Sequence, residues 1–101
     1  MRRIDINETL NQIGLGNVFA ISGGRVARIL NTDGDTCGVR LPINASRRVE
    51  VVLDWDDTYI VRRVRKVTRG SHRGMEVIES EHSGIYCDQV GQMAYEASCW
   101  K

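Results

Sequence analysis

The residues with the clearest potential for chemistry are the acidic group Asp54, Asp56 and Asp57, with Thr58 directly behind them. They follow an apolar run that ends at Leu53. Phosphoryl transfer through a covalent intermediate needs an attacking carboxylate beside a group that carries a proton. Asp54 and Asp56 bring two carboxyl groups to such a position. A catalytic carboxylate pair at the end of a strand is therefore one hypothesis for this segment.

The same segment resembles the D-x-D-x-T signature of haloacid-dehalogenase phosphatases, in which Asp54 would be the nucleophile and Asp56 the general acid-base. That resemblance implies further acidic ligands for Mg²⁺, a lysine that contacts the phosphate, and a parallel sheet with crossover helices. The residues after Thr58 read instead as strand, turn and one helix. We therefore favour a hairpin turn, because aspartate bonds its own backbone in turns, and we expect no enzymatic activity.

Length and composition predict a single domain over residues 1–101, because the chain is 42% hydrophobic and 27% charged and these values are ordinary for globular proteins. The predicted helices and strands assign this domain to the α+β class. The formal net charge of +1 predicts no strong global field, so any attraction to nucleic acid must be local. No apolar run approaches the ~18 residues of a membrane span, and the start MRRIDINETL is too polar for a signal peptide. We expect a cytoplasmic protein without a membrane partner.

The cysteines and histidines predict neither a disulfide nor a metal site. Cys37, Cys87 and Cys99 are odd in number and contain no C-x-x-C pair. The spacing of Cys37, His72, His82 and Cys87 matches no zinc pattern. We therefore predict that the protein uses no metal and no cofactor.

Both ends of the chain carry helical patterns. A first helix is predicted from Asp5, as its N-cap, to Ile13, and Gly14 or Gly16 ends it. A second helix is predicted near the C-terminus, with Asp88 close to its N-cap. Its apolar stripe contains Val90, Met93, Ala94 and Ala97.

Short β-prone segments alternate with turns between the two helices. Gly23 and Gly24 separate the β-prone segments 18–22 and 25–30, which predicts a tight hairpin. A third strand over 36–41 ends at Pro42, a fourth runs over 49–53, and two more flank a turn at 68–74. We expect an antiparallel sheet of five or six strands joined as hairpins or a meander, with the N-terminal and C-terminal helices packed together on one face.

The predicted turns also fix which residues face each other across strands. The predicted pairs are Leu53–Tyr59, Val51–Val61, Val64–Ile78, Lys66–Glu76 and Arg63–Glu79. They bear on a basic cluster that would by itself predict a phosphate-binding stripe: Arg62, Arg63, Arg65, Lys66, Arg69 and Arg73. We expect glutamates on the neighbouring strand to neutralise part of this cluster, which leaves Arg69, His72 and Arg73 at the hairpin tip.

The candidate contacts for a partner protein or for nucleic acid are therefore Arg62, Arg65, Arg69, His72, Arg73 and Trp100. Trp100 near the chain end has two alternative roles. It is either a lid over the core or an exposed anchor for a partner, and we favour the lid.

Three segments carry a resemblance that spans nearly the whole chain: GNVFAISGGRV at 16–26, DTY at 57–59 and YCDQV at 86–90. They resemble a family of small proteins encoded by tailed bacteriophages, particularly those that infect actinobacteria. Relatives elsewhere show a Gly-Asn-x-Phe-x-x-Met-Thr-Gly pattern at the first hairpin and a Thr-Gly near the end, where this chain has Ser98 and Cys99. The resemblance implies a phage origin and a setting in the host cytoplasm, and it transfers no catalytic residues.

Two functions follow as expectations. The first is a non-enzymatic bacteriophage accessory protein that binds a host or phage protein in the infected cell. The alternative is a nucleic-acid-binding protein that uses the basic hairpin from Arg62 to Arg73. A homodimer is compatible with either function.

Overall fold

The computed structural model describes residues 4–54, 58–67, 70 and 74–99. These residues form three helices and one five-stranded sheet. The elements in chain order are α1 (Ile6–Ile13), α2 (Leu15–Ser22), β1 (Ala27–Leu30), β2 (Thr36–Pro42), β3 (Arg47–Leu53), β4 (Tyr59–Lys66), β5 (Glu76–Ile85) and α3 (Val90–Cys99). The predicted α+β fold with an antiparallel sheet is confirmed.

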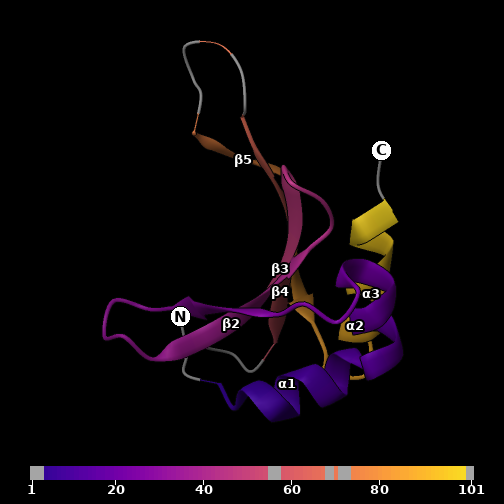
Figure 1. Ribbon diagram of the computed structural model, residues 1–101. Helices are drawn as coiled ribbons and strands as arrows, with labels where there is room; N and C mark the ends of the chain where they lie inside the picture. Colours follow the sequence, from indigo (N-terminus) through magenta and orange to yellow (C-terminus); the bar gives the residue numbers. More distant parts are fainter. Residues whose placement is uncertain (1–3, 55–57, 68–69, 71–73, 100–101) are drawn as a thin grey trace.

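The sheet is a meander in which each strand pairs with the next, in the order β1-β2-β3-β4-β5, and every pairing is antiparallel. The N-terminal helix α1 and the C-terminal helix α3 pack together on one face, as predicted, and α2 packs with them (Figure 1). In the same view the start of β5 lies at the top, beyond the end of α3. The sheet therefore has one face covered by helices, one open face, and an end that extends past the helices.

The first helix forms as its capping residues predict. Asp5 Oδ1 accepts the backbone N–H groups of Asn7 at 2.9 Å and Glu8 at 3.3 Å, which satisfies two donors that the first turn leaves without partners. Gly14 ends α1 at a φ of 93°, and its N–H donates to the Leu10 carbonyl at 2.9 Å. A positive φ of this kind is one that glycine adopts without steric cost.

The hairpin predicted around Gly23 and Gly24 is wrong, because residues 15–22 form α2. Gly23 has a φ of 66°, and its N–H donates to the Phe19 carbonyl at 2.9 Å, which makes it the C-cap of this helix. A tight hairpin turn needs the same positive φ, so the glycines alone could not separate the two structures. Burial distinguishes the helix from the hairpin, because Val18 and Ile21, three residues apart, are both buried in the core.

The remaining strands follow the predicted register closely. The pairs Leu53–Tyr59, Val51–Val61, Val64–Ile78 and Lys66–Glu76 are all present. Arg63 lies opposite Ser80, because an irregularity between Arg63 and Val64 inserts Glu79 as an extra residue. The predicted turn at Asp56 lies outside the described residues. On either side of it, the Asp54 N–H donates to the Thr58 carbonyl at 2.8 Å.

The core lies between the helices and the alternate residues of the sheet that point towards them. It contains Val39, Leu41, Val49, Val51 and Val61 from the sheet, with Val90, Ala94 and Ala97 from the predicted stripe of α3. Met93 is only partly buried. Gly91 lets α3 approach α1, because a Cβ at this position would lie 2.2 Å from the Ile13 carbonyl oxygen. Each helix in the described part of the chain falls short of the length and apolar character needed to cross a membrane.

Candidate functional site at the open face and free edge of the sheet

Four charged residues cross the open face in register, one from each of four neighbouring strands: Arg40, Glu50, Arg62 and Glu81. We call them the charged row. Arg40 Nε lies 3.0 Å from Glu50 Oε2, and Arg62 Nη1 lies 3.9 Å from Glu50 Oε1. Arg62 Nε lies 3.0 Å from Glu81 Oε2. The charges alternate in sign along the row, which ends on a carboxylate at the edge strand β5.

Glu50 anchors this row although no described helix covers the open face. It is only 6% exposed, and its Oε2 accepts a second hydrogen bond from Arg48 Nε at 2.7 Å. Arg48 Nη2 lies 2.8 Å from Glu76 Oε2 on the edge strand. A buried carboxylate is costly unless cations and donors compensate it, and the guanidinium groups of Arg40 and Arg48 supply that compensation.

The pKa shifts of Glu76 and Arg48 agree with the ion pair between them. The hydrogen bond from Arg48 lowers the pKa of Glu76 below its usual range, and the positive charges of Arg48, Arg40 and Lys66 act in the same direction. Burial alone would lower the pKa of Arg48, but its hydrogen bonds to Glu76 and Glu50 outweigh that effect and raise it. Both groups are therefore charged at neutral pH, and the ion pair reaches the edge of the sheet.

A second charged group lies on the face of the sheet that the helices cover. Glu79 Oε1 is 3.2 Å from both Arg47 Nε and Arg63 Nε, and its Oε2 is 3.5 Å from Arg65 Nε. Arg63 Nη1 also donates to the Ala97 carbonyl at 3.3 Å, which ties the sheet to the last turn of α3. We call these four charged residues the Glu79 group. Three guanidinium groups share one carboxylate, so the group has an excess of positive charge.

The edge strand β5 has exposed apolar side chains at its start and directly before it. Met75 is 56%, Val77 40% and Ile78 54% exposed, and we call these three residues the apolar edge cluster. Ile78 lies opposite Val64 on the open face, whereas Val77 lies opposite Arg65 on the other face. Among the described strands, β5 pairs with β4 alone. Its outer side therefore presents backbone groups to which a further strand can bond.

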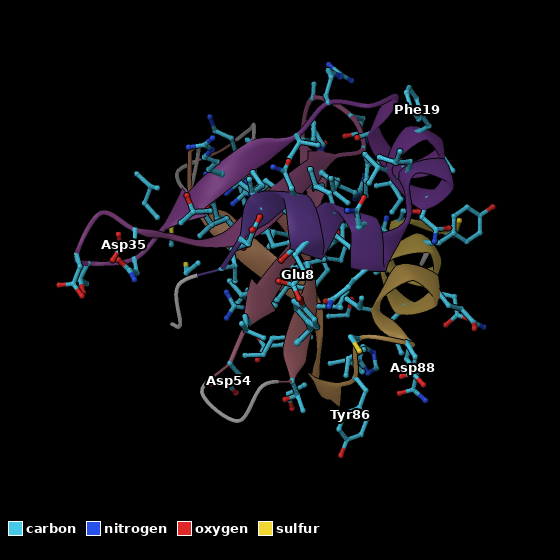
Figure 2. All side chains as sticks on the ribbon, turned by 90° about the horizontal axis from the view of Figure 1, so that it is seen from below. Glu8, Phe19, Asp35, Asp54, Tyr86 and Asp88 are labelled. Carbon is cyan, nitrogen blue, oxygen red and sulfur yellow. The ribbon has the colours of Figure 1, made fainter. Side chains whose placement is uncertain are left out.

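Figure 2 shows the opposite end of the molecule from below and labels three acidic residues there: Glu8 on α1, Asp54 after β3 and Asp88 before α3. A hollow of about 280 Å³ lies beside the β1–β2 connection, and it is lined by Ile4, Ile6, Arg28, Gly34, Asp35 and Thr36. These lining residues bring one cation and one carboxylate together with small and apolar groups. They do not resemble a built binding site.

The predicted site residues divide into two sets. Arg62 and Arg65 lie on β4 and point to opposite faces of the sheet, where Arg62 pairs with Glu81 and Arg65 with Glu79. The predicted pairing of the basic cluster with cross-strand glutamates is therefore present for Arg62, Arg63 and Arg65. The other predicted contacts lie outside the described residues: Arg69, His72, Arg73 and Trp100.

The residues proposed for catalysis and metal binding are only partly described. Asp54 and Thr58 flank the β3–β4 connection, and Asp56 lies outside the described residues. In the described part of the chain, His, Cys, Asp and Glu side chains form no group of three that could hold a metal ion. Cys37 is buried, and Cys87 and Cys99 are exposed free thiols.

Sequence reasoning missed Glu50 and its partners Arg40 and Arg48. The sequence signal was the charged start of β3, with Arg47, Arg48 and Glu50 ahead of the apolar run from Val51 to Leu53. Comparison with known proteins adds no relative, since no family model, no curated protein and no solved structure matches this chain. The resemblance to phage proteins therefore stays a prediction.

Proposed function

We propose that this chain is a non-enzymatic binding protein that takes up a protein partner along the free edge of β5. The observation that carries this proposal is an edge strand of ten residues, Glu76–Ile85, that is exposed along most of its length. The apolar edge cluster lies at its start. Addition of a partner strand to an exposed edge is a recurring mode of peptide recognition. In the setting that the phage resemblance implies, the partner would be a host or phage protein.

The apolar edge cluster supports the proposal energetically. Natural proteins usually blunt a free edge with charges, bulges or a covering segment, because an open edge invites pairing. Here β5 contains glutamates and pairs irregularly with β4 at two places. The side chains of Val77 and Ile78 are nevertheless exposed to solvent. Because complete burial of such a side chain is worth roughly 1.5–3 kcal/mol and these are already half buried, a partner that covers them gains on the order of 1 kcal/mol from each.

A double substitution on the edge tests the proposal. Val77→Lys with Ile78→Lys should abolish capture of the partner from a nuclease-treated lysate, since lysine on an edge strand opposes pairing. The matched control is Leu15→Lys, which places the same charge at an exposed apolar position on α2. Hydrogen exchange should then show protection of the β5 amides when the purified partner is added. A partner that still binds the double variant, or that leaves β5 unprotected, would contradict the proposal.

Nucleic-acid binding is the second candidate, and the Glu79 group favours it. Its excess of positive charge, carried by partly exposed Arg47 and Arg65, could contact phosphates. The three glutamates of β5 weigh against it, because carboxylates along the same edge repel a phosphate backbone. We therefore rank this function below protein binding.

A further inference from the structure

We infer that the strand accepted by β5 presents two basic residues to the open face, one opposite Glu81 and one opposite Glu76, with an apolar residue opposite Ile78 between them. The inference rests on the proposed function and specifies its partner. Such a segment has the pattern basic-x-apolar-x-basic.

The charged row supports the basic residue opposite Glu81. The signs alternate from Arg40 through Glu50 and Arg62 to Glu81, one strand at a time. In antiparallel sheets, opposite charges on directly facing residues are favourable and like charges are unfavourable. A strand added outside β5 continues the row, so the residue that faces Glu81 is favoured as a cation.

The carboxylates on the edge have room for a second cation. Glu81 is 44% and Glu76 is 51% exposed in their side chains, and an ionised carboxylate accepts several hydrogen bonds. Glu50 already accepts two cations within the sheet, because its Oε2 lies 3.0 Å from Arg40 Nε on β2 and 2.7 Å from Arg48 Nε on β3 itself. Glu81 and Glu76 each have one arginine on their inner side and solvent on their outer side.

The strand β4 already shows the pattern that fits β5 from its inner side. The register pairs Arg62 with Glu81, Val64 with Ile78 and Lys66 with Glu76. The β4 segment from Arg62 to Lys66 is therefore basic-x-apolar-x-basic on the open face. Because Glu79 is the extra residue of the bulge, Ile78 and Glu81 both point to the open face although three positions separate them. A partner strand without a bulge can therefore face Glu81, Ile78 and Glu76 with every second residue, as Arg62, Val64 and Lys66 of β4 do.

The same charges disfavour a second copy of β5 as the occupant of this edge. The strand Glu76–Ile85 contains three glutamates and no lysine or arginine. Self-pairing would therefore bring carboxylates together and supply no lysine or arginine opposite Glu81 or Glu76. Like charges directly opposite in a sheet are destabilising. A basic strand from another protein places cations opposite Glu76 and Glu81, whereas a homodimer through β5 does not.

Three synthetic peptides test the pattern directly. They share a strand-forming frame and carry the cores lysine-threonine-valine-threonine-lysine, glutamine-threonine-valine-threonine-glutamine and glutamate-threonine-valine-threonine-glutamate. We expect the lysine peptide to bind about tenfold more tightly than the glutamate peptide, since two cross-strand pairs change from attractive to repulsive. The glutamine peptide should lie between them. The preference should shrink as salt is added, because the pairs are exposed to solvent.

Charge reversal on the protein supplies the decisive comparison. Glu76→Lys with Glu81→Lys should invert the preference, so that the glutamate peptide becomes the tightest binder. The matched control is Glu96→Lys, which reverses an exposed charge on α3 away from the edge. It should leave the order of the three peptides unchanged.

The outcomes separate this inference from the proposed function. Equal affinity of the three peptides, together with protection of the β5 amides, overturns the charge pattern and leaves edge binding in place. Absence of binding by every peptide also overturns the inference, and the proposed function is then judged by the Val77 and Ile78 double variant with its captured partner. An unchanged preference in the Glu76 and Glu81 double variant overturns the inference as well.

Discussion

Arg48 and Glu50 lie two residues apart on β3, and Arg48 Nε donates to Glu50 Oε2 across 2.7 Å. The pair lies on the face of the sheet that the described helices leave open, yet Glu50 is almost fully buried. Arg40 covers the same oxygen from β2. Arginine stems can cover apolar surface while their guanidinium groups hold a carboxylate. Ion pairs therefore take the place of a covering layer on this part of the sheet.

Loss of the Glu50 charge should destabilise the fold. Glu50→Gln leaves Arg40 and Arg48 without their shared carboxylate, and hydrogen bonds to charged groups are worth about 1.5–3 kcal/mol each. Because Arg40 is partly exposed, we expect the free energy of unfolding to fall by about 2 kcal/mol in total. Urea denaturation measures this change. The control Glu81→Gln removes a half-exposed carboxylate and should cost less than about 1 kcal/mol; equal losses in both variants would contradict the central position of Glu50.

Close approach of two helices makes Gly91 sensitive to substitution. A Cβ at this position would lie 2.2 Å from the Ile13 carbonyl oxygen and 2.8 Å from Asn17 Nδ2. The carbonyl is main chain and cannot rotate away, so Gly91→Ala should cost roughly 1–3 kcal/mol through overpacking. Gly16→Ala in α2 is the matched control, because no atom lies within 4 Å of a Cβ built there. It should stabilise the helix by up to about 1 kcal/mol, and thermal unfolding of both variants checks the contrast.

Tyr59 should make stability decline in alkaline solution. Burial raises the pKa of its hydroxyl above 10.0, and the negative charge of Glu8 adds to this effect. The hydroxyl also donates to Gln12 Oε1 of α1. The folded state therefore holds this proton more tightly than the unfolded state does, so the contribution is complete at neutral pH and is lost as the pH rises past 10.0.

Chemical denaturation of the parent protein and of Tyr59→Phe at neutral and alkaline pH measures that contribution. The variant should be less stable than the parent at neutral pH, because it lacks the bond to Gln12. The difference should narrow as the pH rises. Parallel stability profiles for the two proteins would show that the Tyr59 hydroxyl does not titrate differently in the two states.

Much of the sheet could be predicted because turn signals and hydrophobic alternation fix register. The pairs Val51–Val61 and Val64–Ile78 follow once the turns are placed, since a shift of one residue would turn every apolar side chain to the wrong face. The identity of α2 could not be predicted in this way. Its segment is rich in β-prone residues, and its helical state depends on Val18 and Ile21 reaching a core built by distant strands.

Of the candidate site, only part of the ion pairing between β4 and β5 could be predicted. The cross-strand bond between Arg63 and Glu79 follows from the predicted turn at 68–74, and it is present at 3.2 Å. The environment of Glu50 depends on the register between β2 and β3. These strands are joined by a polar loop whose length fixes no single register. The sequence therefore indicated the pairs on β4 and β5 but not the row that joins them to β2.

The Glu79 group provides the test that separates the two binding functions. Arg47→Gln with Arg65→Gln removes two of its three guanidinium groups, and both side chains are exposed enough that the fold should persist. If nucleic acid binds here, losing two phosphate contacts should flatten the dependence of log affinity on log salt by about two. We expect no such change, because the glutamates of β5 lie beside these arginines. Arg28→Gln on β1 controls for the loss of charge, and a flattened slope in the double variant alone would place nucleic-acid binding above protein binding.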